Sequence, residues 1–360
     1  MELLKYNINI SLCCLFISTF FSLLLTPFLI RFGTKFNYLD YPNDRKKHKK
    51  EVVNIGGISI LIGIYSVLII MYILMKLGKM MIIDDLYLII PLIFFTNLII
   101  FTTGFYDDKY SLSPSLRLLI QLSSASLMWI MGLRIDLIDF TFINTSYLII
   151  HVPTILSYAI TVIWIAGIIN AINWLDGMDG LAAGVCLLIS LGMMVIGFNI
   201  GNNLAIIFSS SIIGSCLGFL AYNFTPAKII MGDAGSNLLG FNLALTSIIL
   251  LRDQNTVGIL PFSFIIFFVP IFDMLKVIFL RFRKGLSPFH PDRNHLHFQL
   301  LRTNLSEKKV ILLIYFLVLV SLSISFITFD LSLSVPLLMT SIMAIFYIIY
   351  SHFFKTNSTN

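Results

Sequence analysis

The sequence predicts an all-α, polytopic integral membrane protein with about eleven transmembrane helices, within a range of ten to eleven. Hydrophobic residues make up 58% of the 360-residue chain, only 12% of the residues are charged, and the mean hydropathy is +0.94. A soluble domain carries about 25% charged residues, so this composition excludes an ordinary soluble protein. Because no polar stretch is long enough to fold alone, we expect one transmembrane domain over residues 1–360.

Long apolar runs define the individual spans, because a helix needs about 20 apolar residues to cross a bilayer. The first run is too long for a signal peptide and no small-residue cleavage pattern follows it, so we interpret it as a helix. The four cysteines lie inside apolar runs and predict neither disulfides nor a zinc site. The predicted spans cover residues 8–30, 53–75, 86–105, 115–133, 154–172, 181–199, 203–222, 236–251, 257–280, 309–329 and 332–352.

The positions of the basic residues predict the orientation of these spans. With eleven spans, 19 of the 24 lysines and arginines fall on the side of the loop 31–52, and the other five fall on the opposite side. Basic residues concentrate in cytoplasmic loops, so we predict the N-terminus outside and the C-terminus inside. The basic run from Arg45 to Lys50 suits anionic lipid heads, and one or two of its lysines are candidates for holding a substrate phosphate.

Four clusters of acidic residues or histidines interrupt the apolar runs, and all four fall on the predicted cytoplasmic side. A carboxylate at a bilayer centre costs about 2.5–3.5 kcal/mol, so clusters of this kind indicate a function. The orientation was derived without them, and their agreement therefore supports one active site on the cytoplasmic face. The clusters are Asp107-Asp108, Asn173 to Asp179, Gly232 to Ser236, and His290 to His297.

The first two clusters are paired carboxylates. Asp107 and Asp108 repel each other unless a divalent cation or a shared proton relieves the repulsion, and a solvated turn is the alternative. Asp84-Asp85 falls on the other side without companion motifs and is interpreted as an ordinary loop. Asp176 and Asp179 are three residues apart, which on a helix puts them on one face. Asparagines at 170 and 173 extend this stripe beyond what helix–helix packing alone requires.

The last two clusters combine backbone and side-chain groups that suit phosphates. Gly232 to Ser236 predicts a tight turn into a helix, whose backbone N–H groups can face an anion, and Asp233 within it suggests a metal that bridges carboxylate and phosphate. His295 and His297, after Asp292 and Arg293, fit a metal site or a phosphate-binding loop, with a solvated loop as the alternative.

Together these groups fit metal-assisted phosphoryl transfer, in which Mg²⁺ uses one or two carboxylates and the substrate phosphates. The motifs GxxxxGK[ST], GxSxG and HExxH are absent, which argues against P-loop ATPases and the corresponding hydrolases. An ion-coupled membrane transporter would also place carboxylates such as Asp176 and Asp179 in the membrane. The sequence shows no internal repeat, however, and its motifs lie toward one face. Substrate uptake by proteoliposomes without phosphoryl transfer would favour the transporter.

The ordered motifs DDKYSLSP, NAINWLDGMDGLAAG, MGDAGSNLLGF and DRNHLH resemble those of the polyprenyl-phosphate N-acetylhexosamine-1-phosphate transferases, over about residues 45–301. The resemblance implies a multi-pass enzyme of the bacterial inner membrane. It would transfer a HexNAc-1-phosphate, most commonly GlcNAc-1-phosphate, from a UDP-sugar to undecaprenyl phosphate and release UMP. The cofactor would be Mg²⁺, with Mn²⁺ as an alternative. The partners would be the two substrates and the lipid bilayer, with a homodimer compatible and no nucleic acid.

The resemblance also implies roles for individual residues. Asp233 would be the leading magnesium ligand, together with Asp107, which would also position or deprotonate the lipid phosphate. The other implied catalytic residues are Asp108, Asp176, Asp179, His295 and His297. The implied substrate-binding residues are Lys49, Asn173, Asn223 (at the uridine), Gly232, Ser236 and Arg293. The product would initiate a cell-envelope glycan such as O-antigen, teichoic acid or capsule.

Three departures from the family pattern bear on the donor sugar. Phe298 stands where a further histidine often follows HLH, and Ile230 stands where an aromatic residue commonly precedes MGD. Glu51 and Val53 stand where prolines are usual. UDP-N-acetylfucosamine, UDP-N-acetylquinovosamine and UDP-MurNAc-pentapeptide therefore remain alternative donors. The span count and the His-Leu-His motif favour the sugar-only branch over the pentapeptide transferase.

Overall fold

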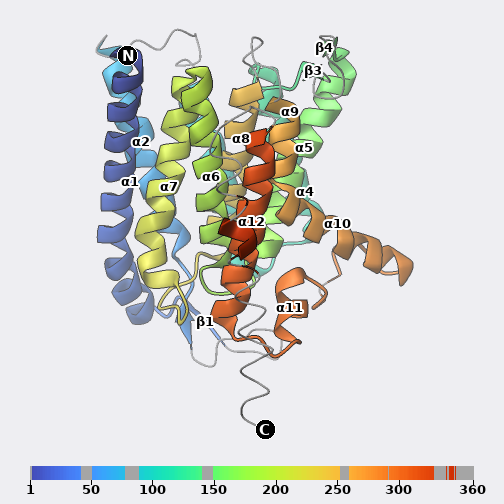
Figure 1. The fold of residues 1–360 in the computed structure, drawn as a ribbon. Coiled ribbons are helices and arrows are strands. Elements are labelled where there is room, and N and C mark those ends of the chain that lie inside the picture. Colours follow the sequence, from blue (N-terminus) through green and yellow to red (C-terminus); the bar gives the residue numbers. More distant parts are fainter. Residues whose placement is uncertain are drawn as a thin grey trace. The chain divides into compact units, whose positions relative to one another are not determined.

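The computed structural model is mostly helical (Figure 1) and describes residues 2–41, 51–77, 89–139, 149–251, 259–290 and 292–327, with a few positions between 338 and 345. Lys49 and Asp84-Asp85 lie outside the described residues, and so does most of the predicted span 332–352. The chain forms two compact units, Met1–Ile138 with His151–Thr256, and Asp139–Ile150 with Val257–Asn360. The single domain over the whole chain stays a prediction.

The first unit is a bundle in which α1 packs along α7 and α7 packs along α6 (Figure 1). Its segments are apolar over most of their length, and their helical conformation satisfies the backbone hydrogen bonds within each segment, as a bilayer requires. The helices of this unit are α1 (Glu2–Lys35), α2 (Gly57–Lys76), α3 (Ile90–Tyr110), α4 (Pro114–Ile130), α5 (Thr154–Leu175), α6 (Leu181–Ile200), α7 (Asn203–Asn223) and α8 (Gly232–Leu251).

The second unit contains four helices in its described part, and α12 packs against each of the other three. They are α9 (Ile259–Ile266), α10 (Phe268–Arg283), α11 (Leu296–Leu301) and α12 (Glu307–Ile327).

A multi-pass membrane protein is confirmed, because eight helices of the described part are long and apolar enough to cross a bilayer: α1, α2, α3, α5, α6, α7, α8 and α12. The total of eleven spans and the orientation stay predictions. The predicted span 115–133 is the helix α4, whose 17 residues lie at the lower limit of the length that crosses a bilayer.

The prediction of one helix over 257–280 was wrong, since the chain forms α9 and α10 with a break at Phe267. Pro270 has no N–H group to donate to the carbonyl of Ile266, which interrupts the helical hydrogen bonds there. The helix α10 is also amphipathic rather than apolar all round. Its exposed apolar stripe is Phe268, Phe272, Leu275, Phe279 and Phe282.

Two short sheets, which the all-α prediction did not include, complete the fold. Strands β1 (Leu39–Asp40) and β2 (Val52–Val53) pair antiparallel, and β3 (Leu137–Asp139) pairs with β4 (Ile149–His151). Val53 also forms a parallel bridge with Ile229, and the N–H of Ile230 donates to the Val53 carbonyl at 2.9 Å. These bonds tie the segment before α2 to the segment that leads into α8.

The helix α8 lies inside the first unit and packs against α2, α3, α5, α6 and α7. Its contact with α3 contains a fully buried pair, in which the amides of Asn97 and Asn242 donate to each other over 3.3 and 2.6 Å. Further along, Gly104 lets the two backbones touch, because a Cβ there would lie 2.5 Å from the carbonyl oxygen of Asp233. The end of α3 is therefore held against the beginning of α8.

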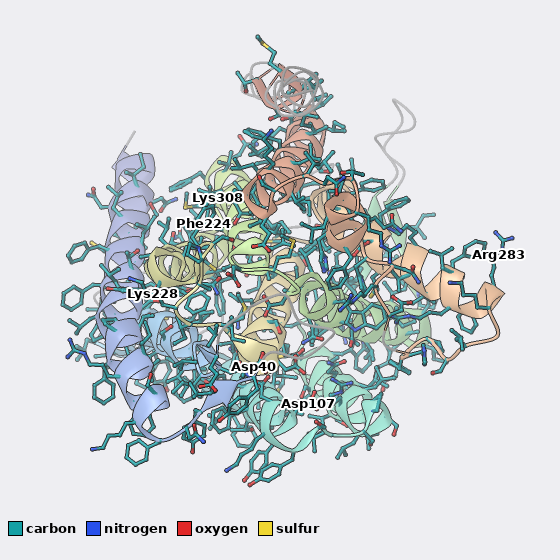
Figure 2. All side chains as sticks on the ribbon, turned by 90° about the horizontal axis from the view of Figure 1, so that it is seen from below. Asp40, Asp107, Phe224, Lys228, Arg283 and Lys308 are labelled. Carbon is teal, nitrogen blue, oxygen red and sulfur yellow. The ribbon has the colours of Figure 1, made fainter. Side chains whose placement is uncertain are left out.

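Figure 2 views the end of the first unit where the chain leaves α3 and enters α8, and it shows Asp40, Asp107, Phe224 and Lys228 at this end. The C-terminal ends of α3, α5 and α7 and the N-terminal end of α8 meet here, because consecutive helices run in alternating directions. Motifs that are more than a hundred residues apart in the sequence are brought to one end of the bundle in this way.

We predict that Gly104→Ala destabilises the first unit, by about 1–3 kcal/mol, because its methyl group would overlap backbone atoms of α8 that cannot move aside. The matched control is Gly167→Ala in α5, where a Cβ meets nothing within 4 Å. An alanine in that helix should stabilise by up to about 1 kcal/mol. Thermal unfolding midpoints of the purified variants in detergent check this, and equal midpoints for the two variants would contradict it.

Candidate functional site

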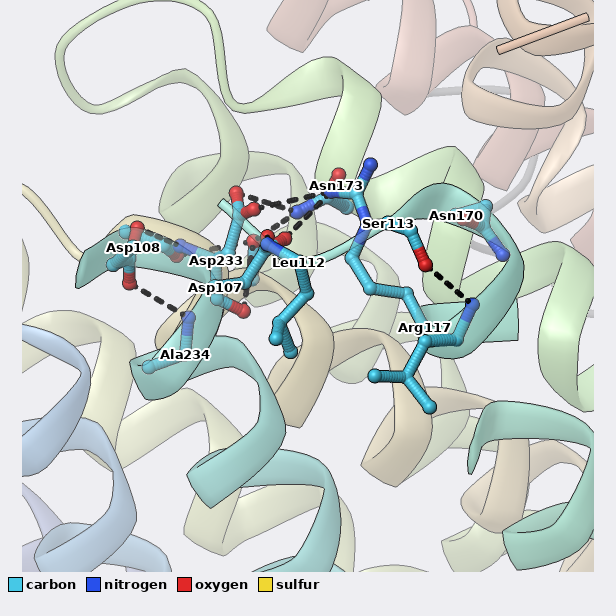
Figure 3. Close-up of polar contacts among 12 residues, drawn as sticks. Asp107, Asp108, Leu112, Ser113, Arg117, Asn170, Asn173, Asp233 and Ala234 are labelled. Carbon is cyan, nitrogen blue, oxygen red and sulfur yellow. Dashed lines mark hydrogen bonds and ion pairs between the residues drawn. The ribbon is translucent and has the colours of Figure 1, made fainter. Parts of the chain in front are cut away.

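Three of the sequence motifs meet at this end of the first unit, as the close-up in Figure 3 shows. Asp107 and Asp108 end α3, Asn173 lies in the last turn of α5, and Asp233 begins α8. A network of hydrogen bonds and ion pairs joins these side chains, so the structure brings together the residues that the sequence analysis assigned to one site.

Asp107 is buried and both of its carboxylate oxygens accept hydrogen bonds. The backbone N–H of Leu112 donates to Oδ1 at 2.7 Å, and Nη1 of Arg117 donates to Oδ2 at 2.6 Å. The sequence between them explains this geometry. Ser111 adopts a left-handed φ of 51°, and Ser113 caps α4 by accepting from the N–H of Leu116. The turn therefore reverses the chain and places Arg117 opposite Asp107.

Asp108 accepts hydrogen bonds from the first turn of α8, with the N–H of Asp233 at 3.0 Å and that of Ala234 at 3.2 Å. The side-chain amide of Asn54 donates to the same carboxylate at 3.3 Å. Gly232, with a φ of +67°, leaves room for it, since a Cβ there would lie 2.4 Å from Oδ2. We expected these N–H groups to face a substrate anion. They bind the chain's own carboxylate instead, so Gly232 acts here by positioning Asp108.

Asp233 receives hydrogen bonds from two other helices. Nδ2 of Asn173 donates to its Oδ1 at 3.0 Å, and Nη1 of Arg117 lies 3.5 Å from its Oδ2. The same amide of Asn173 reaches the hydroxyl of Ser236 at 3.0 Å. Ser236 is fully buried and donates to the carbonyl of Gly232, so it supports Asn173 from within the helix. Arg117 thus lies between Asp107 and Asp233 and neutralises part of their charge.

Asp176 and Asp179 do not share a helical face, because α5 ends at Leu175 and both follow it in the turn before α6. The N–H of Ala227 donates to Oδ2 of Asp179 at 2.8 Å, so this carboxylate holds the loop after α7. The half-buried carboxylate of Asp176 accepts no hydrogen bond from any residue that the structure describes. Its burial, together with the charges of Asp108 and Asp179, raises the pKa of Asp176 to about 8.

Two more predicted residues of this unit, both asparagines, join separate segments of the chain. Asn223 is buried, accepts from the N–H of Gly180 at 2.9 Å and donates to the carbonyl of Ile229 at 2.8 Å. It therefore links the turn after α5 to the segment before α8. The contact of Asn223 with uridine stays a prediction. Asn170 donates to Oε1 of Gln121 at 2.6 Å and joins α5 to α4.

The histidine motif belongs to the second unit. Nδ1 of His295 lies 2.9 Å from Oδ2 of Asp273 in α10, and the ring of His297 stacks on that of His295 with centroids 5.8 Å apart. Asp292 pairs with Arg281 at 3.0 Å. Partial burial raises the pKa of Asp292, but the hydrogen bonds from Arg281 and Asn294 outweigh it and hold this pKa below its usual range.

Arg293 is exposed, and its carbonyl accepts from the side chain of Arg302 at 3.0 Å. The contact of Arg293 with substrate stays a prediction.

The sequence analysis missed three residues that hold the site residues in place: Asn54, Arg117 and Asp273. Arg117 was counted only among the basic residues that predict the orientation of the spans. The serine cap and the proline at the start of α4 nevertheless put this arginine in the first turn of the helix. Asp273 could have been found, because it is a lone carboxylate inside a predicted apolar span. Nothing in the sequence marks Asn54.

The donor set of the first unit fits a divalent cation that a substrate would help to bind. Asp107, Asp108, Asp176 and Asp233 are joined by contacts or charge interactions, with Arg117 as the basic side chain among them. In the described part of the chain no three histidine, cysteine or acidic residues form a ready metal site. The carboxylates fit Mg²⁺ by their chemistry, because this ion commonly uses one or two carboxylates and takes its other oxygens from phosphates and water.

Comparison with known proteins points to one family. The profile of Glycosyl transferase family 4 matches residues 90–251. A Bacillus subtilis (strain 168) protein named "Probable undecaprenyl-phosphate N-acetylglucosaminyl 1-phosphate transferase" is 35% identical over 81% of this chain and 78% of its own length. The "Decaprenyl-phosphate N-acetylglucosaminephosphotransferase" of Mycobacterium leprae is 31% identical, over 76% and 73%. The Escherichia coli (strain K12) "Undecaprenyl-phosphate alpha-N-acetylglucosaminyl 1-phosphate transferase" is 29% identical, over 82% and 77%.

The raised pKa of Asp176 predicts a pH-dependent stability in the absence of divalent cations. An aspartate in the unfolded chain ionises near pH 3.9, whereas Asp176 in the folded protein ionises near pH 8. Between these values unfolding releases a proton, so the thermal midpoint should fall as the pH rises from about 5 to 8. Asp176→Asn should make this fall less steep.

The control is Asp136→Asn, whose carboxylate pairs with Arg134 and accepts from Ser157. It should keep the wild-type slope. Midpoints in EDTA across this pH range provide the measurement, and an unchanged slope in Asp176→Asn would show that this group does not titrate there.

Proposed function

The chain belongs to glycosyl transferase family 4, and we propose that it transfers N-acetylglucosamine 1-phosphate from UDP-N-acetylglucosamine to a polyprenyl phosphate and releases UMP. The observation that carries this proposal is the meeting of Asp107, Asp108, Asp176 and Asp233 around the start of α8, with Arg117 among them. The names of three relatives, each matched over about three quarters of this chain or more, support a sugar-phosphate transferase of this kind.

The reaction requires an oxygen of the lipid phosphate to attack the phosphorus that carries the sugar, while the bond to the uridine monophosphate breaks. Both substrates bring negative charge, so the enzyme's work is mainly positioning and charge neutralisation. Asp233 and Asp107 are the residues that would hold Mg²⁺, and the carboxylate of Asp176 lies within range of the charge of Asp108. The ion would offset the charge of the phosphates.

The chain's own groups then divide the remaining work. Arg117 lies between Asp107 and Asp233 and provides a guanidinium that suits a phosphate oxygen. Asn173 holds Asp233 in place with a hydrogen bond. Asp107, fixed by Leu112 and Arg117, is the candidate to position or deprotonate the lipid phosphate.

Charge and composition support a proposal for the place in the cell. We propose the bacterial inner membrane, with the N-terminus outside and the carboxylates on the cytoplasmic face, because 19 of the 24 basic residues fall on that side in the predicted topology. A nucleotide sugar is available on that face, and the phosphate of a polyprenyl lipid lies at the same interface. Undecaprenyl phosphate is the acceptor we propose, as in the names of the Bacillus and Escherichia relatives. The product would begin a cell-envelope glycan.

Asp233→Asn should lower the transfer rate by at least about 100-fold, because it removes a negative charge that would hold Mg²⁺ at the reacting phosphates. Membranes containing equal amounts of each protein are given radiolabelled UDP-N-acetylglucosamine, undecaprenyl phosphate and Mg²⁺, and labelled lipid and UMP are measured. The matched carboxylate-to-amide control, Asp136→Asn, should keep wild-type activity, since Asp136 pairs with Arg134 in the turn before β3.

In wild-type membranes labelled lipid should equal UMP and disappear with EDTA. Full activity of Asp233→Asn would remove this residue from the proposed mechanism. If wild-type protein forms no labelled lipid, UDP-N-acetylfucosamine, UDP-N-acetylquinovosamine and UDP-MurNAc-pentapeptide are the next donors, and failure with all of them would overturn the transferase.

A further inference from the structure

The second unit contains a buried carboxylate–imidazole pair whose carboxylate the sequence motifs do not include. Oδ2 of Asp273 lies 2.9 Å from Nδ1 of His295, and both side chains are buried, with relative exposures of 3% and 7% for the two residues. The other oxygen, Oδ1, accepts from the backbone N–H of Leu296 at 2.7 Å. One carboxylate therefore binds both the ring of His295 and the backbone of the residue that follows it.

The helix α10 is built to hold this loop. Its buried stripe, with residues four apart, is Val269, Asp273, Val277 and Arg281. The two charged members of the stripe each bind the segment that carries the histidines. Asp273 binds His295 and Leu296, and Arg281 binds Asp292 and the carbonyl of Pro288. The apolar positions on the opposite side of α10 are exposed. The contacts with the segment that carries the histidines therefore explain why the charged residues of this helix are buried.

We infer that Asp273 is the positioning residue through which His295 acts in the transfer reaction. The inference rests on the proposed function. A carboxylate at Nδ1 holds the ring with its Nδ1–H toward the carboxylate, which fixes the neutral tautomer and leaves Nε2 as the nitrogen for any other contact. Asp273 thus determines which atom of His295 meets a phosphate or a transferable proton, and in which direction that atom points.

The surroundings of the pair favour this geometry. Nζ of Lys276, one turn along α10, lies 3.3 Å from Oδ1 of Asp273, so the carboxylate is held ionised by a cation on its own helix. The ring of His297 lies nearly parallel to that of His295, at an interplanar angle of 9°, and limits rotation of the ring. His295 itself precedes α11 in extended conformation, with the N–H of Leu296 turned to Asp273.

The test is a double-mutant cycle on Asp273→Asn and His295→Ala in the transferase assay, with thermal midpoints measured for each variant. The amide of asparagine keeps the size and one acceptor oxygen for the N–H of Leu296. It can also offer an N–H to Nδ1, which would move the ring proton to Nε2. We therefore expect Asp273→Asn to lose at least about tenfold in kcat, since groups of this kind contribute about 10²–10⁴ to rates.

The cycle separates positioning from structural support. If Asp273 acts through His295, the double variant is no slower than His295→Ala alone, because the histidine is already gone. If the rate losses of the two single variants multiply in the double variant, the inference is overturned. A wild-type kcat in Asp273→Asn would also overturn it. The matched control is Glu307→Gln in the first turn of α12, which should keep wild-type activity. If Asp273→Asn does not fold, Asp273→Glu, which keeps the charge, takes its place in the same cycle.

The outcome is distinguishable from failure of the proposed function. If wild-type protein shows no transferase activity, the ¹⁵N chemical shifts of labelled histidine show which ring nitrogen of His295 is protonated. A protonated Nδ1 in wild type that is lost in Asp273→Asn supports the positioning of His295, and an Nδ1 without a proton in wild type overturns it.

Discussion

Asp108 binds two N–H groups in the first turn of α8, and the rest of the carboxylate site depends on this contact. Those N–H groups carry the partial positive charge of the helix, so a carboxylate is stabilised there more than elsewhere in an apolar bundle. The contact also joins the end of α3 to the beginning of α8, and Gly104 lets the two backbones come close enough for it. Asp107 and Asp233 become neighbours as a result.

The charges of the first unit are unequal, and this inequality supports the proposed binding of phosphates together with a divalent ion. Asp108 is compensated by backbone and amide donors, and Asp107 by Arg117 and Leu112. Asp233 shares Arg117 at the longer distance of 3.5 Å, and Asp176 has no hydrogen-bond donor in the described part of the chain. Two anionic substrates would add to the deficit of positive charge. A cation that binds together with them removes it.

Much of this could be predicted from the sequence, because the periodic and compositional signals are strong. The apolar runs indicated α1 to α8 and α12, and the polar motifs indicated Asp107, Asp108, Asn173 and Asp233. The break at Phe267 was missed because composition does not weigh the missing N–H of Pro270. Asp176 and Asp179 were assigned to a helical face, although the glycines after Leu175 end the helix. Asn54 could not be found, because its place beside Asp108 depends on the pairing of Val53 with Ile229.

The two units solve the burial of a carboxylate in the same way. Asp108 on α3 accepts from the backbone at the start of α8 and from the amide of Asn54, and Asp273 on α10 accepts from the backbone at the start of α11 and from the ring of His295. Each carboxylate uses one of its two oxygens for a backbone N–H group. Its other oxygen contacts a side chain or a second N–H group as well. An isosteric amide keeps only one of the two acceptors. The ionised carboxylate of such a residue accepts hydrogen bonds at both oxygens. It therefore holds the start of a helix and orients a functional side chain at the same time.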